Sequence, residues 1–322
     1  MKSKGIVIFL VILGIVIVAI IAGDYISTRP DKQPGNPYEL NLNEFREVDP
    51  KLILFTETKN FRISPDSLNG LSYHKGILYL TGDKKLQMID KSGRLTNEIS
   101  LTGTPSCVHA TAGKIFVGLG NRISVYSPEG TLIAEWPPIS DSTYLTSLAS
   151  KGDHLFIADA GKRVVYHYRV SGEKIGEING KTDNDALHGF VIPSPNFDLA
   201  FDPDGELWIV NPGNHSLENY SPDGSLRGFW KNSAATIDGF YGCCNPAHIA
   251  FLPNGNFVTC EKGMIRIKIY KPSGDFLGVV APPSKFTEGG HPCDLAVDEA
   301  GVVYALDKDK KAIRIFEENS GL

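Results

Sequence analysis

Five cysteines carry the most distinctive chemistry of this sequence. Two of them, Cys243 and Cys244, are adjacent and precede the segment Pro246-Ala247-His248. Thiolates bind soft or borderline metals such as zinc and copper, and adjacent thiols can close a strained, labile disulfide ring. Outside the reducing cytoplasm cysteines also form disulfide staples, and buried thiols act as small apolar side chains. The sequence leaves three interpretations open: a metal or redox site, structural disulfides, or inert thiols.

The elements that must position these residues are short strands joined by tight turns. Asp202-Pro203-Asp204-Gly205, Ser221-Pro222-Asp223-Gly224 and Lys271-Pro272-Ser273-Gly274 are turn sequences, because proline presets φ and glycine accepts a positive φ. Short apolar segments such as 155–157 and 207–209 lie between the turns. Six such units follow one another without a helical period, at the spacing of about 40–50 residues that is typical of propeller blades. The pattern predicts an all-β, six-bladed β-propeller over residues 51–322.

A propeller must close its ring, because an unpaired sheet edge invites aggregation. The last unit, residues 293–318, contains only three strand segments before the chain ends. The segment 51–57 (Lys-Leu-Ile-Leu-Phe-Thr-Glu) precedes the first unit and has the character of a lone strand. We expect it to supply the missing outer strand of the last blade.

Alignment of the first strand of each unit places one residue per blade beside the central channel. These equivalent positions are Gly70, Cys107, Ser147, Asp198, His248 and Asp294. Cys293 comes one residue before its ring position. Cys260 ends a second strand and is expected opposite Ala247 in an antiparallel hairpin. All five cysteines are thereby predicted on one face of the propeller, with two histidines. The predicted metal or redox site comprises Cys243, Cys244, Cys107, Cys260, Cys293, His248 and His291, for zinc, copper or a redox-active thiol pair.

Two aspartates and a serine are the other polar residues predicted to line the channel. Asp198 and Asp294 could hold calcium together with backbone carbonyls, and Ser147 is the ring position just before Asp198. The alternative is that both carboxylates satisfy buried backbone amides. Lys262, Arg266 and Lys268 lie beside Glu261 in sequence, and we interpret them as a solvated blade face.

The N-terminal region predicts a membrane anchor. Residues 1–5 contain Lys2 and Lys4, which favour a cytoplasmic N-terminus. The apolar run 6–23 would span about 27 Å as a helix, close to the thickness of a hydrocarbon core, and a cleaved signal peptide is the alternative. Residues 24–50 are polar and proline-containing and are expected to form an extended tether. This predicts a single-pass protein of the cell membrane, with the propeller on the periplasmic or extracellular side.

Composition excludes some classes of partner. The chain has 322 residues, a net charge of -5 and 21% charged residues, and no basic stripe is present, so nucleic-acid binding is not expected. We find no Ser-His-Asp pattern, phosphate loop or nucleotide fingerprint.

Several segments resemble the NHL-repeat family of six-bladed propellers. Residues 213–224 (GNHSLENYSPDG), 292–298 (PCDLAVD) and 197–205 (FDLAFDPDG) are close to that repeat, and the resemblance covers about residues 52–322. Residues 239–246 (GFYGCCNP) resemble an exported bacterial subgroup with a Cys-Cys-Asn-Pro motif. The resemblance implies the fold and little about use, because NHL propellers include scaffolds, ligand-binding modules and a few metal-dependent enzymes.

The function that we expect is a membrane-anchored, extracytoplasmic module that binds a protein or small-molecule ligand on a propeller face. The alternative is a metal- or thiol-dependent redox enzyme, or an electron-transfer accessory, that uses the cysteine-rich face. A calcium-dependent hydrolase or lyase using Asp198 and Asp294 is a third hypothesis. Whether the chain is an enzyme stays open at this stage.

Overall fold

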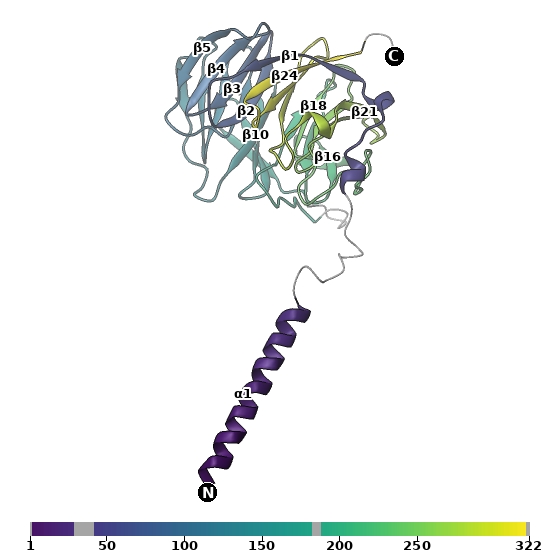
Figure 1. Cartoon of the computed structure of the whole chain (residues 1–322). Helices are drawn as coiled ribbons and strands as arrows, with labels where there is room; N and C mark the ends of the chain where they lie inside the picture. Colours follow the sequence, from purple (N-terminus) through teal and green to yellow (C-terminus); the bar gives the residue numbers. More distant parts are fainter. Residues whose placement is uncertain (1, 29–41, 182–187, 320–322) are drawn as a thin grey trace. The chain divides into compact units, whose positions relative to one another are not determined.

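The computed structural model describes residues 2–28, 42–181 and 188–319, which belong to two units (Figure 1). The first unit, residues 1–42, contains a single long helix. The second, residues 43–322, contains all the strands. The predicted tether 24–50 falls partly outside the described residues. Its described ends contain the last turn of the helix and two short 3-10 helices, η2 (Leu42–Phe45) and η3 (Pro50–Leu52).

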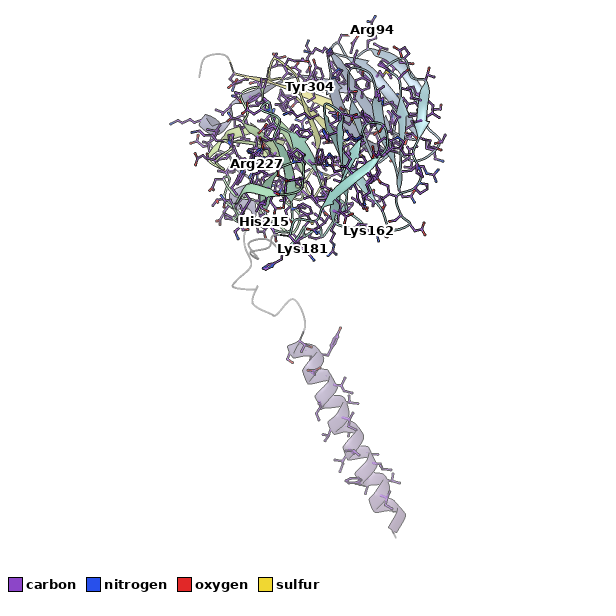
Figure 2. All side chains as sticks on the ribbon, turned by 180° about the vertical axis from the view of Figure 1, so that it is seen from behind. Arg94, Lys162, Lys181, His215, Arg227 and Tyr304 are labelled. Atoms are coloured by element: carbon purple, nitrogen blue, oxygen red, sulfur yellow. The ribbon has the colours of Figure 1, made fainter. Side chains whose placement is uncertain are left out.

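Helix α1 spans Lys2–Ser27 and is longer than the apolar run 6–23 from which it was predicted. Its segment Lys4–Ser27 contains an 18-residue window with a mean hydropathy of 3.4, and α1 is the one helix in the described part of the chain that is long and apolar enough to cross a membrane. Figure 2 shows its side chains projecting all around the helix axis, and the large apolar ones are exposed. These properties fit a single-pass anchor, and they fit a signal sequence equally well.

Six four-stranded antiparallel sheets form the second unit, so the all-β, six-bladed prediction is confirmed. Each sheet is one blade, with its first strand innermost. The strands of blades 1 to 3 are β2 (Leu68–His74), β3 (Ile77–Gly82), β4 (Lys85–Asp90), β5 (Leu95–Ser100); β6 (Cys107–Ala110), β7 (Ile115–Leu119), β8 (Arg122–Tyr126), β9 (Leu132–Glu135); and β10 (Leu145–Lys151), β11 (His154–Asp159), β12 (Val164–Arg169), β13 (Lys174–Ile178).

Blades 4 to 6 follow the same order, except that the last blade borrows its outer strand from the start of the unit. Their strands are β14 (Leu199–Phe201), β15 (Leu207–Asn211), β16 (Ser216–Tyr220), β17 (Leu226–Lys231); β18 (His248–Phe251), β19 (Phe257–Cys260), β20 (Ile267–Tyr270), β21 (Phe276–Ala281); and β22 (Asp294–Val297), β23 (Val303–Asp307), β24 (Ala312–Glu318), β1 (Phe55–Arg62).

The ring is closed by β1, which pairs antiparallel with β24 from Phe55 opposite Glu318 to Arg62 opposite Ala312. The closing strand was expected at 51–57, so its predicted bounds lie too early in the chain. Asp49 accepts a hydrogen bond from the Lys51 amide at 2.9 Å and caps the 3-10 turn of η3, which keeps the first of these residues out of the sheet.

The hydrophobic core lies between neighbouring blades, where one blade face packs on the next. The cluster shared by blades 3 and 4 contains Phe156, Ile209 and Tyr220, all at most 1% exposed. Blades 5 and 6 share a second such cluster, which includes Cys260 and Cys293. Because alternate strand residues point to opposite faces, each blade contributes to two of these clusters. The innermost strand of each blade lines the central channel.

Candidate functional site

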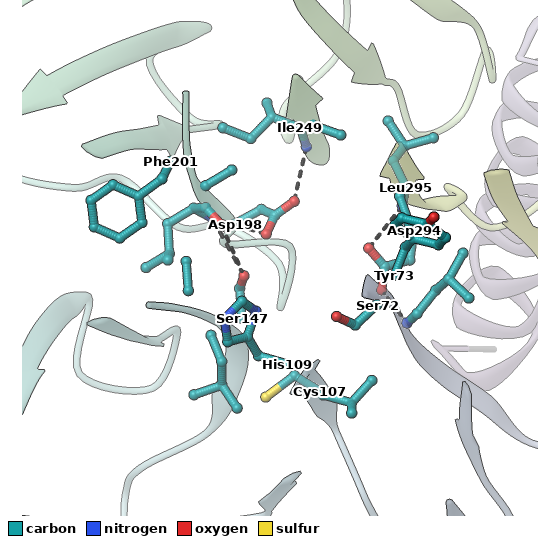
Figure 3. Close-up of a pocket in the computed structure, with 18 of the residues that line it drawn as sticks. Ser72, Tyr73, Cys107, His109, Ser147, Asp198, Phe201, Ile249, Asp294 and Leu295 are labelled. Atoms are coloured by element: carbon teal, nitrogen blue, oxygen red, sulfur yellow. Dashed lines mark hydrogen bonds between the residues drawn. The ribbon is translucent and has the colours of Figure 1, made fainter. Parts of the chain in front are cut away.

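The innermost strands of all six blades line a central cavity of about 340 Å³. Figure 3 shows its wall, with polar side chains from several blades converging on the channel. Carboxylates, hydroxyls and one imidazole lie near phenyl rings in this lining. The residues that bear these groups include Ser72, His109, Ser147, Asp198, Phe201 and Asp294.

Asp198 and Asp294 each join two neighbouring blades through backbone amides. Asp198 Oδ2 accepts a hydrogen bond from the Ile249 amide at 2.8 Å, and Asp294 Oδ2 accepts one from the Leu71 amide at 2.7 Å (Figure 3). The other oxygen of each carboxylate accepts from the next amide along its own chain, at 2.8 and 2.9 Å. This is the amide-satisfying role that the sequence offered as an alternative to calcium binding.

His248 lies between these two aspartates, because it begins the inner strand of the blade that separates theirs. Its Nδ1 is 3.4 Å from Asp198 Oδ2 and 3.4 Å from Asp294 Oδ1. Burial raises the pKa of Asp294, and the charge of His248 opposes that shift. Within the residues that the structure describes, these three form the only set of three or more His, Cys, Asp or Glu side chains whose ligand atoms lie within 4.8 Å of one another.

Ser147 and Cys107 lie in the channel wall as the ring alignment predicted, but outside this set. The Ser147 hydroxyl is 3.4 Å from both the amide nitrogen and the carbonyl oxygen of Leu199 on the next blade. Cys107 is buried beside Ser106, and burial raises the pKa of its thiol to about 12. A thiol with that pKa is not a thiolate at neutral pH, so Cys107 is a poor nucleophile here.

His109 belongs to the cavity wall and was missed by sequence reasoning. Its Nε2 is 2.9 Å from the Ser150 hydroxyl, which links blade 2 to blade 3. Burial, together with a smaller effect of the charge of His74, lowers the pKa of His109 to about 4. The available signal was its position two residues after Cys107, which puts both side chains on the same side of one inner strand.

The adjacent cysteines lie in the loop before β18. Cys243 is exposed and Cys244 is buried, with their sulfur atoms 2.9 Å apart and no disulfide between them. Burial raises the pKa of Cys244, and the neighbouring Cys243 thiol raises it further. His215 holds the loop through the Gly242 carbonyl at 2.5 Å, and Asn245 bonds the backbone of Lys262 at 2.6 and 3.0 Å.

Cys260 and Cys293 lie together in the buried layer between blades 5 and 6. The Cys293 amide donates a hydrogen bond to Cys260 Sγ at 3.2 Å, and both side chains are 0% exposed. A hydrogen bond to the Cys260 thiol raises the pKa of Cys293, and burial adds to this. Cys260 pairs with His248 in the β18–β19 register, and not with Ala247 as expected.

The predicted cysteine site is therefore distributed over three places. All five cysteines are free, and no thiol belongs to the three-residue set around His248 in the described part of the chain. His291 is exposed and pairs with Asp309 at 2.8 Å. The pair Cys243–Cys244, of which Cys243 is exposed, stays a candidate for thiol chemistry, whereas Cys260 and Cys293 are fully buried, and the seven predicted residues do not converge on one ion.

Two of the three basic residues that were interpreted as a solvated face, Arg266 and Lys268, form a buried network instead, so the interpretation is wrong for them, whereas Lys262 is exposed. Arg266 and Lys268 are both 0% exposed and lie 2.7 and 2.8 Å from the Glu261 carboxylate. They also donate to carbonyls of the segment 235–239, including Gly239 at 3.1 and 2.6 Å. The segment before Cys243 folds over these charges, and a single sequence cannot reveal which strand face a distant loop will cover.

Comparisons with known proteins establish the fold and nothing finer. No family model and no curated protein matched the sequence. The structure of a streptogramin B lyase superposes with a TM-score of 0.61 and 14% identity, covering 83% of this chain and 98% of that one. Virginiamycin B lyase from Staphylococcus aureus gives a TM-score of 0.55 and 14% identity, covering 83% and 90%. A protein of unknown function from Bacteroides thetaiotaomicron gives 0.59 and 13%, covering 83% and 76%.

At these sequence identities the structural similarity shows that the fold is a propeller, and it does not indicate which activity this chain has. The finer assignment to NHL repeats and to a subgroup with a Cys-Cys-Asn-Pro motif stays a prediction from the sequence.

Proposed function

We propose that this chain is a membrane-anchored, extracytoplasmic propeller that binds a small-molecule ligand in its central channel. The observation that carries the proposal is the cavity of about 340 Å³, to which the inner strands of all six blades contribute. Its volume lies in the range of small-molecule sites, which combine an apolar wall with a few convergent polar groups.

The lining suggests the chemistry of the ligand. Carboxylates of Asp198 and Asp294 lie where the inner strands begin, whereas Phe201 and Phe251 lie where the inner strands of their blades end. Hydroxyls such as that of Ser147 lie among these groups. A ligand with an apolar body and one polar end matches this distribution.

The proposed anchor is helix α1, and its orientation follows from charge. Lys2 and Lys4 precede the apolar stretch, and basic residues stay on the cytoplasmic side of a first membrane helix. The propeller then lies outside. The structural neighbours include a streptogramin B lyase and a virginiamycin B lyase, and the latter was solved in a catalytically inactive form with quinupristin. We take from them only that this architecture is compatible with a small-molecule site.

Topology is tested on intact cells that express the full chain. Cys243 is the one cysteine with an exposed side chain in the described residues. After brief reduction, a small membrane-impermeant maleimide should label it without cell lysis, and the Cys243→Ser variant should lose that label. The label should remain with the membrane pellet after carbonate washing. Labelling that requires lysis would contradict an extracytoplasmic propeller, and labelled protein in the wash would contradict an anchor.

Ligand binding is tested by thermal unfolding of the full chain in detergent against a panel of carboxylate-, phosphate- and sugar-bearing metabolites. A ligand at a hundred times its Kd stabilises the folded state by about 2.7 kcal/mol. The matched variant is Ser150→Trp, which puts a large ring on the cavity wall beside His109. A saturable rise in Tm that is lost in this variant supports the proposal. A panel without any such rise contradicts it.

A second candidate function is thiol–disulfide exchange at Cys243–Cys244, because their sulfur atoms lie 2.9 Å apart and one of them is exposed. In this reaction the two cysteines form a disulfide and give two electrons and two protons to an external protein disulfide, whose S–S bond breaks to leave two thiols.

Thiol counting on the denatured full chain tests this candidate. Incubation of the reduced chain with a protein disulfide should lower the count from five to three, and the Cys243→Ser variant should keep all four of its thiols. Loss of thiols from that variant would locate the exchange elsewhere and contradict a function for this pair.

A further inference from the structure

We propose that Asp198, His248 and Asp294 bind one divalent metal ion of the zinc class, with a coordination position open toward the central cavity. The inference deepens the proposed function and rests on it only for the ligand that would occupy the open position. Three neighbouring blades supply one ligand side chain each: Asp198 precedes β14, His248 begins β18 and Asp294 begins β22.

The spacing of the ligand atoms suits a metal ion better than a hydrogen bond. Charge-assisted N–H···O bonds measure about 2.7–2.9 Å, and the 3.4 Å from His248 Nδ1 to either carboxylate oxygen is well beyond that range. Two atoms 3.4 Å apart, each about 2.1 Å from a common ion, subtend an angle of about 110° at that ion, which is the tetrahedral angle of zinc sites.

The two carboxylates are held in place before any ion arrives. All four of their oxygen atoms accept a backbone N–H, from Leu199, Ile249, Leu71 and Leu295. A carboxylate oxygen has two acceptor positions, so each one keeps a position for a cation. Hydrogen bonds of this kind orient metal ligands and raise affinity in characterised sites.

Charge in the cluster is also unbalanced. Two carboxylates meet with one imidazole, and among the described residues only His248 lies within ion-pair distance of either aspartate, while Lys308 acts on Asp294 from farther away. Carboxylates that converge in a partly buried site repel one another, and a bound cation removes that repulsion. Even a protonated His248 would leave one net negative charge, which a divalent ion would more than compensate.

The donor set selects the class of metal. Calcium prefers six to eight oxygen ligands, and this cluster offers two carboxylates and an imidazole nitrogen. Imidazole with carboxylate suits zinc and its neighbours, and three protein ligands with a vacant position are typical of zinc sites that bind a water or substrate. Because both aspartates also line the cavity, an oxygen donor of a cavity ligand could reach the ion.

The decisive experiment uses the full chain in detergent, stripped with EDTA and titrated with Zn²⁺ while bound metal is counted by mass spectrometry. We expect one zinc per chain, and His248→Ala should weaken binding at least about 100-fold. His291→Ala is the matched control, because His291 also pairs with an aspartate but lies outside the cluster. The Cys243→Ser, Cys244→Ser double variant should bind zinc as wild type does.

Several outcomes would overturn the inference. They are a wild-type chain that takes up no zinc, a His248→Ala chain with unchanged affinity, and loss of zinc in the double cysteine variant. Unfolding curves of His248→Ala and His248→Gln in EDTA should match those of wild type, which shows that the loss of metal is not a loss of fold.

The open position is tested with Co²⁺ in place of zinc and acetohydroxamate as an exogenous oxygen ligand. Its addition should change the visible absorption of the cobalt chain with saturation, and an unchanged spectrum overturns the open position. The two proposals fail separately. If the chain binds zinc but no ligand raises its Tm, the metal site is supported and the proposed ligand binding is contradicted. If a ligand raises the Tm but the chain binds no zinc, the ligand binding is supported and the metal site is contradicted.

Discussion

Two clusters of charged side chains, which have blade 5 in common, differ in how completely their charges are matched. In the first, Glu261 meets Arg266 and Lys268, and the five N–H groups of Arg266 all have acceptors among Glu261 and three carbonyls. Lys268 adds contacts to the faces of Phe240 and Tyr270.

In the second cluster, His248 faces two carboxylates at 3.4 Å without a bond of ordinary length to either. All the donors of Arg266 in the first cluster are bonded, and the cluster holds a loop, whereas each carboxylate oxygen of the second keeps one acceptor position beside a cavity. A buried network with every group satisfied indicates a structural role, and an unsaturated one indicates a ligand.

The largest effect is expected from opening the closed cluster. Glu261→Ala leaves two buried cations without their carboxylate, and such changes cost about 3–5 kcal/mol of unfolding free energy. Urea unfolding measures the loss. Glu177→Ala removes an exposed partner of Lys174 and should cost less than about 1 kcal/mol. Equal losses of unfolding free energy in both variants would show that the buried cluster contributes no more to stability than an exposed ion pair does.

The next largest effect is expected from the aspartates of the open cluster, because they also bond backbone amides. Asp198→Ala leaves the Leu199 and Ile249 amides without their carboxylate acceptor, at about 1–3 kcal/mol each. Asp204→Ala, in an exposed turn, should stay within about 0.5 kcal/mol of wild type. If Asp198→Ala leaves the free energy of unfolding unchanged in metal-free buffer, the hydrogen bonds of Asp198 to these amides do not stabilise the fold, and this prediction is wrong.

A pH effect is expected from the same cavity wall. The pKa of His109 is lowered to about 4 in the folded chain, and an unfolded histidine titrates near 6.5. The folded state therefore binds fewer protons in this window, and unfolding free energy should fall by at most about 1.4 kcal/mol per unit as pH drops from 6.5 to 4. His109→Gln should flatten that part of the curve in urea titrations, and an unchanged slope would exclude His109 as its source.

The smallest effect is expected from His248 itself when no metal is present. His248→Ala should change unfolding free energy by less than about 1 kcal/mol in EDTA, because the ring has no short hydrogen bond to lose. Zinc at a hundred times the wild-type Kd should then stabilise wild type by about 2.7 kcal/mol and the variant by no more than about 0.4 kcal/mol. A large loss in EDTA would mean that the imidazole is a structural tie like Arg266.

Much of the architecture could be predicted from the sequence, because it depends on local chemistry. Pro-x-Gly turns set the hairpins, as in Asp202–Gly205, where the Gly205 amide bonds the Asp202 carbonyl and φ is 84°. Alternation of apolar residues then identifies the inner strands, and counting from them placed Asp198, His248 and Asp294 at equivalent positions. The bounds of the closing strand were less accurate, because a 3-10 turn competes for the same residues.

Side-chain partners were decided by the tertiary structure, because they lie on different blades. The sequence grouped His248 with the cysteines that surround it in the chain, yet the nearest ligand atoms come from residues about 50 positions away on either side. Cys260 and Cys293 turn into the layer between blades, and Arg266 and Lys268 lie under a loop that no periodicity reveals. Repetition in sequence determines where a residue lies along its blade, and only the closed ring decides which neighbour it faces.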